Sequence, residues 1–379
     1  VEVATKNCVK DFNYAGLITI KVEKSELSIF SYGGTASLIA KISDNNVGSL
    51  DYTCIEEGSA TIKAAQFKEA LMTQINGKVE ISLNKGEVVV KLLSDKTVKR
   101  SIALIDNAVT VPNVGRKVEQ SFEIDREVFL TGLNDVMWAP ATEEKMSSYM
   151  CLLVETKTNG DAQEVRFSAG SGGRFVVKSI AGKNVYKAGE DIRMILPKNN
   201  LSNIHKFVSS IPGRTLSISS FEQEAEAFIP EQIDIECNGS TLCIFGTENL
   251  TKYPDMDSII NYLYPNRIYS DMNDWPLAIN GVELTQMDYD SNIHNTEVVF
   301  DVEQEKFMVT PQTSYVSTTP VRAVDIESCV IKGDKIWFKC NSEYLLEMVH
   351  KAGKNDKVQL NIESQEVLND TSSDKPLQR

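Results

Sequence analysis

The stretch "IRMILPKNNLSNIHKFVSSIPGRTLSIS", Ile192–Ser219, holds three structural elements in a short run. Apolar residues recur at three- and four-residue spacing over Lys198–Ile211, which predicts an amphipathic helix. An apolar run precedes this helix, and apolar and polar residues alternate after it, so a strand is expected on each side. The stretch is therefore interpreted as a strand–helix–strand unit.

The same unit occurs earlier and later in the chain, at Gly58–Leu92 and Lys335–Glu363. The helices predicted within these two copies cover Ala64–Ile75 and Asn341–Gly353. A predicted strand hairpin precedes each copy, and the three hairpins cover Leu27–Ile42, Val165–Ile180 and Phe307–Val321. An order of elements that recurs three times indicates tandem copies of one domain.

Segments rich in Pro, Gly, Asn and Asp separate the copies at Asn107–Gln120 and Tyr253–Arg267. We therefore expect an α+β protein made of three tandem domains with antiparallel sheets. The expected domains are residues 1–117, 118–252 and 253–379.

The second copy has a further predicted strand and helix, Ser121–Trp138, ahead of its hairpin. The helical part of this segment is Asp125–Trp138. The first copy has only Val1–Ala15 in the corresponding place. It is expected to lack its first strand and helix.

The composition is that of an ordered globular protein of 379 residues with a formal net charge of −14. No run of about 18 apolar residues and no signal-peptide pattern occurs, so a cytoplasmic protein is expected. The seven cysteines are scattered, which favours buried free thiols in a reducing compartment over disulfides. The negative charge argues against a protein that coats nucleic acid with its whole surface, but it permits a basic stripe on one face.

The glycine-rich run "AGSGG", Ala169–Gly173, allows three interpretations. A phosphate-binding loop and a nucleophile elbow at Ser171 both have to open a helix, whereas the residues that follow predict a strand. A hairpin turn is therefore favoured, with a hydrolase built on Ser171 as a minor alternative. The three histidines lie in different segments, so neither a catalytic triad nor a metal site is supported, and no cofactor is expected.

Most of the predicted helices carry cations in an otherwise acidic chain. Examples are Lys68, Arg126, Lys198, Lys206 and Lys351. From composition alone, an ordinary solvated helix face is favoured over a basic binding surface as the explanation for these residues.

Several motifs, in order along the chain, resemble those of the bacterial DNA sliding clamp, the beta subunit of DNA polymerase III. The second hairpin reads "GSGGRF" from Gly170 to Phe175, where that family has a T-D-G-x-R-L run. The other similar motifs are "ILPKNNLSNIHKF" (Ile195–Phe207), "YPDMDSII" (Tyr253–Ile260), "KCNSEYLLEMV" (Lys339–Val349) and the ending "KPLQR".

This resemblance implies a polymerase processivity factor without enzymatic activity. Two chains would form a closed ring around duplex DNA, with antiparallel sheets outside and amphipathic helices lining the hole. The other implied partners are the replicative polymerase, the clamp loader and other proteins with a clamp-binding motif, in a bacterial or phage-infected cell. The residues implied to face DNA are Lys68, Arg126, Lys145, Lys198, Lys206 and Lys351.

The resemblance also implies a peptide pocket between the second and third domains. Its wall would consist of Tyr149, Gly170, Arg174, Phe175, Pro254, Ile259, Pro376 and Leu377. Ser171 replaces the family's aspartate and Phe175 its leucine, so a different peptide preference is expected. Such departures fit a diverged phage or prophage member. Because the first copy is short, a clamp-like scaffold that binds peptides without closing around DNA is the alternative.

Overall fold

We analysed a computed structural model of the chain. It describes residues 16–32, 36–43, 52–72, 78–93, 99–106, 117–141, 150–159, 162–171, 175–182, 185–188, 190–221, 232–245, 253, 255–260, 266–271, 295–301, 306–311, 322–325, 328–330, 335–341, 351 and 357–362. The chain divides into two compact units, Val1–Pro254 and Asp255–Arg379, and each is described by itself.

The first repeat of the first unit begins with four strands that pair antiparallel in the order β3-β2-β1-β4. A helix follows, and then a three-stranded antiparallel sheet in the order β5-β6-β7. The elements are β1 (Leu17–Val22), β2 (Glu26–Tyr32), β3 (Ala36–Ser43), β4 (Gly58–Lys63), α2 (Ala64–Met72), β5 (Val79–Asn84), β6 (Glu87–Leu92) and β7 (Lys99–Ala103). The missing strand and helix predicted for this copy fall on residues 1–15, which lie outside the described residues.

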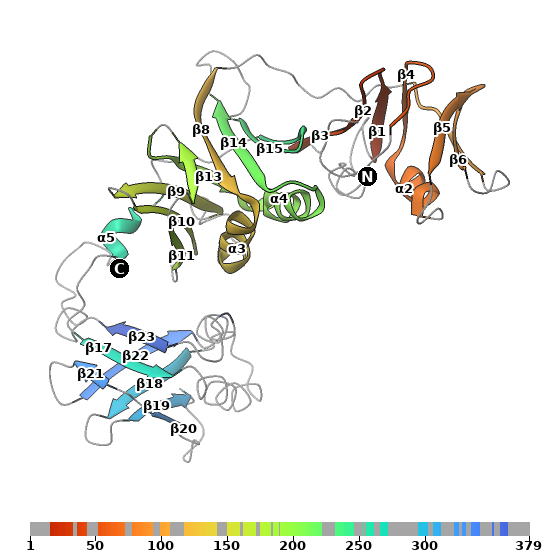
Figure 1. Ribbon diagram of the computed structural model, residues 1–379. Helices are drawn as coiled ribbons and strands as arrows, with labels where there is room; N and C mark the ends of the chain where they lie inside the picture. The colour runs from red at the N-terminus through yellow and green to blue at the C-terminus, as the bar shows by residue number, and fades with distance from the viewer. Residues whose placement is uncertain are drawn as a thin grey trace, which may run out of the picture. The chain divides into compact units, whose positions relative to one another are not determined.

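The second repeat has the same order of elements with one added strand, β12, and a strand and a helix precede it. Its elements are β8 (Val118–Asp125), α3 (Arg126–Val136), β9 (Cys151–Asn159), β10 (Ala162–Gly170), β11 (Phe175–Gly182), β12 (Tyr186–Ala188), β13 (Arg193–Pro197), α4 (Lys198–Ser210), β14 (Thr215–Phe221), β15 (Gln232–Cys237) and β16 (Ser240–Phe245). The sheet β11-β10-β9-β13 repeats the order β3-β2-β1-β4. The helices α3 and α4 lie side by side (Figure 1).

The second unit repeats the pattern again, with sheets in the orders β20-β19-β18-β22 and β21-β17-β23. Its elements are α5 (Met256–Ile260), β17 (Asn266–Asp271), β18 (Asn295–Asp301), β19 (Lys306–Pro311), β20 (Arg322–Asp325), β21 (Ser328–Val330), β22 (Lys335–Asn341) and β23 (Lys357–Ile362). Two residues of the helix predicted over Asn341–Gly353 are described: Lys351 is helical, but Asn341 is the last residue of strand β22, so the predicted start of the helix was too early. The predicted α+β class with tandem antiparallel units is thus confirmed.

The run "AGSGG" lies between two strands, as predicted for a hairpin. Strand β10 ends at Gly170, which pairs with Phe175, the first residue of β11. The two strands stay in register as far as the pair Gln163 and Gly182. Because a strand follows the turn, neither a phosphate-binding loop nor a nucleophile elbow forms there.

A seam between β16 and β3 joins the first two repeats into one nine-stranded sheet. The register pairs Thr241 with Ile39 and Ile244 with Ala36. Two side-chain contacts reinforce the seam. The Ser240 hydroxyl accepts a hydrogen bond of 3.0 Å from the backbone N–H of Lys41, and the rings of Tyr32 and Phe245 meet edge to face. The edges of both sheets are paired in this way.

Helix α3 packs on the sheet that contains β10 and β11. The rings of Phe129 and Phe167 lie 5.7 Å apart at 71°, an edge-to-face contact, and both are fully buried. Gly132, one turn further along α3, faces the same ring. A Cβ at this position would lie 2.2 Å from the Phe167 ring. The glycine therefore lets the helix approach the sheet.

We expect Gly132→Ala to destabilise the protein by about 1–3 kcal/mol, because the added methyl group overpacks the core against Phe167. The matched control is Gly58→Ala on β4, where an added Cβ meets nothing within 4 Å. Thermal or urea unfolding of the two variants measures the difference. Equal stability of the two variants would contradict the close approach of α3 to the sheet.

Candidate functional site

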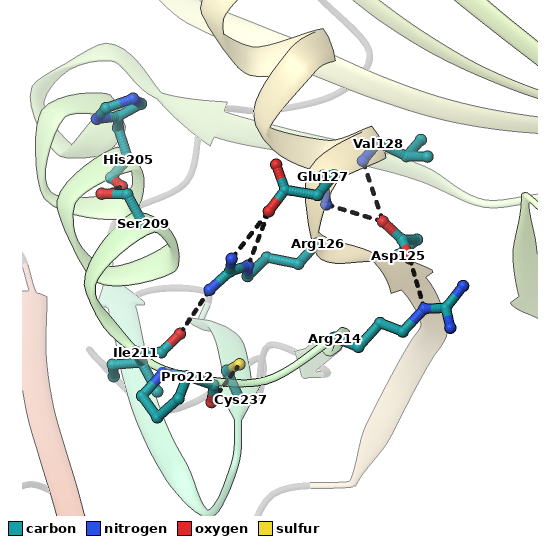
Figure 2. Close-up of polar contacts among 10 residues, drawn as sticks. All are labelled: Asp125, Arg126, Glu127, Val128, His205, Ser209, Ile211, Pro212, Arg214 and Cys237. Carbon is teal, nitrogen blue, oxygen red and sulfur yellow. Dashed lines mark hydrogen bonds and ion pairs between the residues drawn. The ribbon is translucent and has the colours of Figure 1, made fainter. Parts of the chain in front are cut away.

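The start of α3 is fixed by Asp125, which caps the helix. One carboxylate oxygen, Oδ1, accepts hydrogen bonds from the backbone N–H groups of Glu127 (2.9 Å) and Val128 (3.4 Å). The other oxygen, Oδ2, lies 3.3 Å from Nε of Arg214. Figure 2 shows these contacts at the junction between α3 and the end of α4.

Arg126 links α3 to the C-terminal end of α4. Its Nη1 donates to the carbonyl oxygen of Ile211 at 2.9 Å, and its Nη2 lies 2.8 Å from Oε1 of Glu127 (Figure 2). Its Nε donates to the same oxygen of Glu127 at 3.3 Å. The guanidinium group therefore satisfies a carbonyl at the helix end, which has no partner within the helix. Only 25% of the Arg126 side chain is exposed, against 71% for Glu127.

Lys198, the first residue of α4, is also engaged with backbone. Its Nζ donates to the carbonyl oxygens of Pro140 at 3.1 Å and Ala141 at 2.8 Å. Its backbone N–H donates to the carbonyl of Met150 at 3.0 Å. The residue ties the start of α4 to the segment that follows α3.

The other cations implied to face DNA lie in different surroundings. Lys68 on α2 and Lys206 on α4 are half-buried, and Lys351 is exposed. Lys145 lies outside the described residues. Of the six residues, Arg126, Lys198 and Lys206 belong to the α3–α4 pair, with Arg126 at the C-terminal end of α4 and Lys198 at its N-terminal end.

The exposed residues of the helices are mostly uncharged. Those on α2, α3 and α4 are Ala65, Gln66, Glu69, Glu127, Thr131, Asn134, Asn199, Ser202, Ser209 and Ser210. The two charged residues among them, Glu69 and Glu127, are both acidic, while the cations of these helices are only partly exposed. Sequence analysis missed Glu127, although its place beside Arg126 in the first turn of a predicted helix was a visible signal.

Three buried thiols lie in the described part of the second repeat: Cys151, Cys237 and Cys243. The Sγ of Cys237 donates to the carbonyl oxygen of Pro212 at 3.7 Å, next to Gly213. A Cβ at Gly213 would lie 2.7 Å from this sulfur, and its φ of +148° also favours glycine. Burial raises the pKa of Cys237, and burial together with Asp234 raises the pKa of Cys243. Both thiols are therefore protonated at neutral pH, which does not suit a nucleophile.

The structure describes part of the predicted peptide pocket. Gly170 and Phe175 face each other across the β10–β11 turn, and the carbonyl of Gly170 accepts from the N–H of Ala141 at 3.0 Å. Ile259 belongs to α5 in the second unit. The remaining predicted members, Tyr149, Arg174, Pro254, Pro376 and Leu377, lie outside the described residues.

Two features near the β10–β11 turn were missed by sequence analysis. The hydroxyl of Tyr253 donates to the carbonyl oxygen of Ser168 at 3.0 Å, so the linker is anchored to β10. The hydroxyls of Ser168 and Ser171 are buried and have no hydrogen-bond partner among the described residues. The linker motif indicated the segment, but no sequence signal indicated these contacts.

The described residues hold neither a metal-binding cluster nor a membrane-spanning helix. No group of three or more His, Cys, Asp or Glu residues is placed to hold a metal ion. No helix has the length and apolar character needed to cross a membrane.

Comparisons with known proteins point to one fold. No protein-family model matches the chain, and no curated protein matches it. Among solved structures, the DNA polymerase sliding clamp from Pseudomonas aeruginosa, solved with a ligand, has a TM-score of 0.74 at 14% identity, covering 95% of this chain and 89% of that one. The DNA polymerase III beta subunit from Thermotoga maritima has a TM-score of 0.73 at 11% identity, with coverage of 95% and 89%.

The Helicobacter pylori beta clamp, solved with 3,4-difluorobenzamide, has a TM-score of 0.71 at 15% identity, with coverage of 96% and 89%. These likenesses extend over all three repeats. The expected resemblance is confirmed at the level of fold: the chain has the sliding-clamp fold of the bacterial DNA polymerase III beta subunits.

Proposed function

We propose that this protein is a DNA polymerase processivity factor, a homodimeric ring that encircles duplex DNA and tethers a polymerase. The observation that carries this proposal is the clamp fold over 95% of the chain, repeat by repeat. A ring holds DNA by its topology, so the protein needs no catalytic residue and no cofactor for this role. We expect it to act in the cytoplasm of a bacterial or phage-infected cell.

The seam within the chain supports ring closure. It joins β16, the last strand of the second repeat, to β3, the outer strand of the first repeat's hairpin. Among the described strands, β7 corresponds to β16, and β11 and β20 correspond to β3. Among the described residues, β7 pairs only with β6, β11 only with β10 and β20 only with β19. Pairing of β7 in one protomer with β20 of its partner would make two further seams and close a ring of two chains.

DNA contact in such a ring is made to phosphates and is independent of base sequence. The proposed DNA-facing residues are Lys68, Arg126, Lys145, Lys198, Lys206 and Lys351. Their surroundings divide them into two groups. Lys198 donates to two backbone carbonyls, and Arg126 donates to one backbone carbonyl and to Glu127, so both residues serve mainly to hold the α3–α4 pair. Lys206 is then the cation of this pair best placed to meet phosphate.

Partner proteins are proposed to bind through a short peptide at the predicted pocket. The proposed wall residues are Tyr149, Gly170, Arg174, Phe175, Pro254, Ile259, Pro376 and Leu377. Apolar walls with a few polar groups suit an anchored peptide. The partners would be the replicative polymerase, the clamp loader and other proteins with a clamp-binding motif.

A clamp-like scaffold that binds peptides without encircling DNA is the second candidate. The acidic and uncharged residues on the exposed faces of α2, α3 and α4 favour it, because a DNA channel normally presents cations. The two candidates differ in mass in solution. Light scattering at micromolar concentration should give twice the mass of one chain for the ring and the mass of one chain for the scaffold.

For the ring, we expect stable retention on nicked circular duplex DNA and rapid loss after the circle is cut. Topology survives dissociation of individual phosphate contacts, whereas a linear end lets the ring slide off. Gel filtration of protein loaded on circular DNA, with and without a restriction enzyme, measures this difference. Equal retention on circular and linear DNA would refute encirclement.

We expect Lys206→Met to reduce the slope of log affinity against log salt by about one per chain, with little change in stability. Its control, Lys198→Met, should instead lower stability by about 1–3 kcal/mol, because two carbonyls lose a charged donor. Fluorescence anisotropy with a short duplex and urea unfolding measure the two effects. A larger loss of DNA affinity in the Lys198 variant would reverse these assignments.

We expect Phe175→Asp to weaken binding of a clamp-binding-motif peptide at least about tenfold, because a charge replaces an apolar anchor in the pocket wall. Val118→Asp is the matched control, since it places the same charge on an exposed apolar residue of β8. Titration calorimetry gives the affinities, and circular dichroism checks the fold. Unchanged peptide affinity in a folded Phe175→Asp protein would remove this residue from the pocket.

A further inference from the structure

We infer that Glu127 acts as an electrostatic restraint on DNA contact, because it holds the guanidinium group of Arg126 and places a negative charge on the solvent-facing side of α3. This inference rests on the proposed function. Glu127 would lower the affinity of the helices for a DNA phosphate backbone.

The geometry shows how Glu127 occupies Arg126. Two donors of the guanidinium group, Nε and Nη2, point to one oxygen of Glu127, at 3.3 and 2.8 Å (Figure 2). A third donor, Nη1, bonds to the carbonyl oxygen of Ile211. A phosphate that approaches Arg126 therefore has to compete with a carboxylate that is already in place. The planar fork that makes arginine a good phosphate ligand is turned toward an acidic side chain.

The position of Glu127 on the helix adds a second effect. Glu127, Thr131 and Asn134 are the exposed residues of α3, and their spacing of four and three places them on one face. Glu127 is the charged member of this row. Its carboxylate is 71% exposed, so a DNA backbone that runs along this face meets a like charge.

The local structure stabilises the carboxylate where it is. Glu127 lies in the first turn of α3, where the helix dipole favours a negative charge. Its ion pair with Arg126 adds to this preference. Replacing the carboxylate with a neutral amide should therefore change DNA binding much more than it changes the fold.

The test compares two substitutions that remove one negative charge each. Glu127→Gln releases Arg126, whereas Glu123→Gln breaks a similar ion pair, with Lys187 at 3.2 Å, that joins strands β8 and β12 and involves no helix residue. We expect Glu127→Gln to bind a short linear duplex about two- to fivefold more tightly than the unmodified protein at low salt. Its salt slope should rise by about one per chain. Glu123→Gln should leave both values unchanged.

The same Glu127→Gln change made together with Arg126→Lys tests whether Arg126 is the released group. Arg126→Lys keeps a cation but removes the fork, so the gain from Glu127→Gln should shrink in the double variant. An equal gain in DNA affinity in both backgrounds would mean that Arg126 is not the released group. Equal gains from Glu127→Gln and Glu123→Gln would mean that only the net charge of the protein matters. Either result overturns the inference. Because a short linear duplex does not require a closed ring, retention on circular DNA tests the proposed function separately.

Discussion

Backbone pairing at the edges of the sheets is the constraint on which this molecule depends. An antiparallel sheet leaves a row of unpaired N–H and C=O groups along each outer strand, and such rows bind other strands. In the first unit, the outer strands β16 and β3 pair with each other, so that two repeats share one sheet of nine strands. Each copy of the repeat brings a further outer strand, and an unpaired outer strand can pair with the outer strand of another repeat.

The helices follow from the same sheets. Each strand-rich unit has one apolar face to cover, and α3 covers it with Phe129 against Phe167 while Gly132 keeps the helix close. The helices then have their own ends to satisfy. Arg126 and Lys198 do this with side-chain donors to carbonyl groups, which leaves fewer cations on the exposed face. Structural and electrostatic demands on these helices therefore compete for the same residues.

Sequence periodicity was sufficient to predict the helices α2, α3 and α4 and the hairpins β2–β3 and β10–β11, because these depend on residues close together in the chain. The run after Ala169 was correctly interpreted as a turn, since the residues beyond it alternate as a strand does. The hydrogen-bond partners of the cations Arg126 and Lys198 could not be predicted from periodicity. Arg126 meets a carbonyl 85 positions away and Lys198 one 58 positions away. No local pattern records contacts at such separations, and the same is true of the buried hydroxyls of Ser168 and Ser171.

The seam between β3 and β16 also sets an order of events during synthesis. Lys41 and Ser240, which meet there, are 199 positions apart. At about 5–20 residues per second, the ribosome needs roughly 10–40 s to make the chain between them. Throughout that interval the outer edge of β3 lacks its native partner, and once β7 (Lys99–Ala103) has been made, all described strands of the first repeat are present. The nascent chain therefore passes through a stage in which its first sheet is open to pairing with a strand of another molecule, and the arrival of β16 ends that stage.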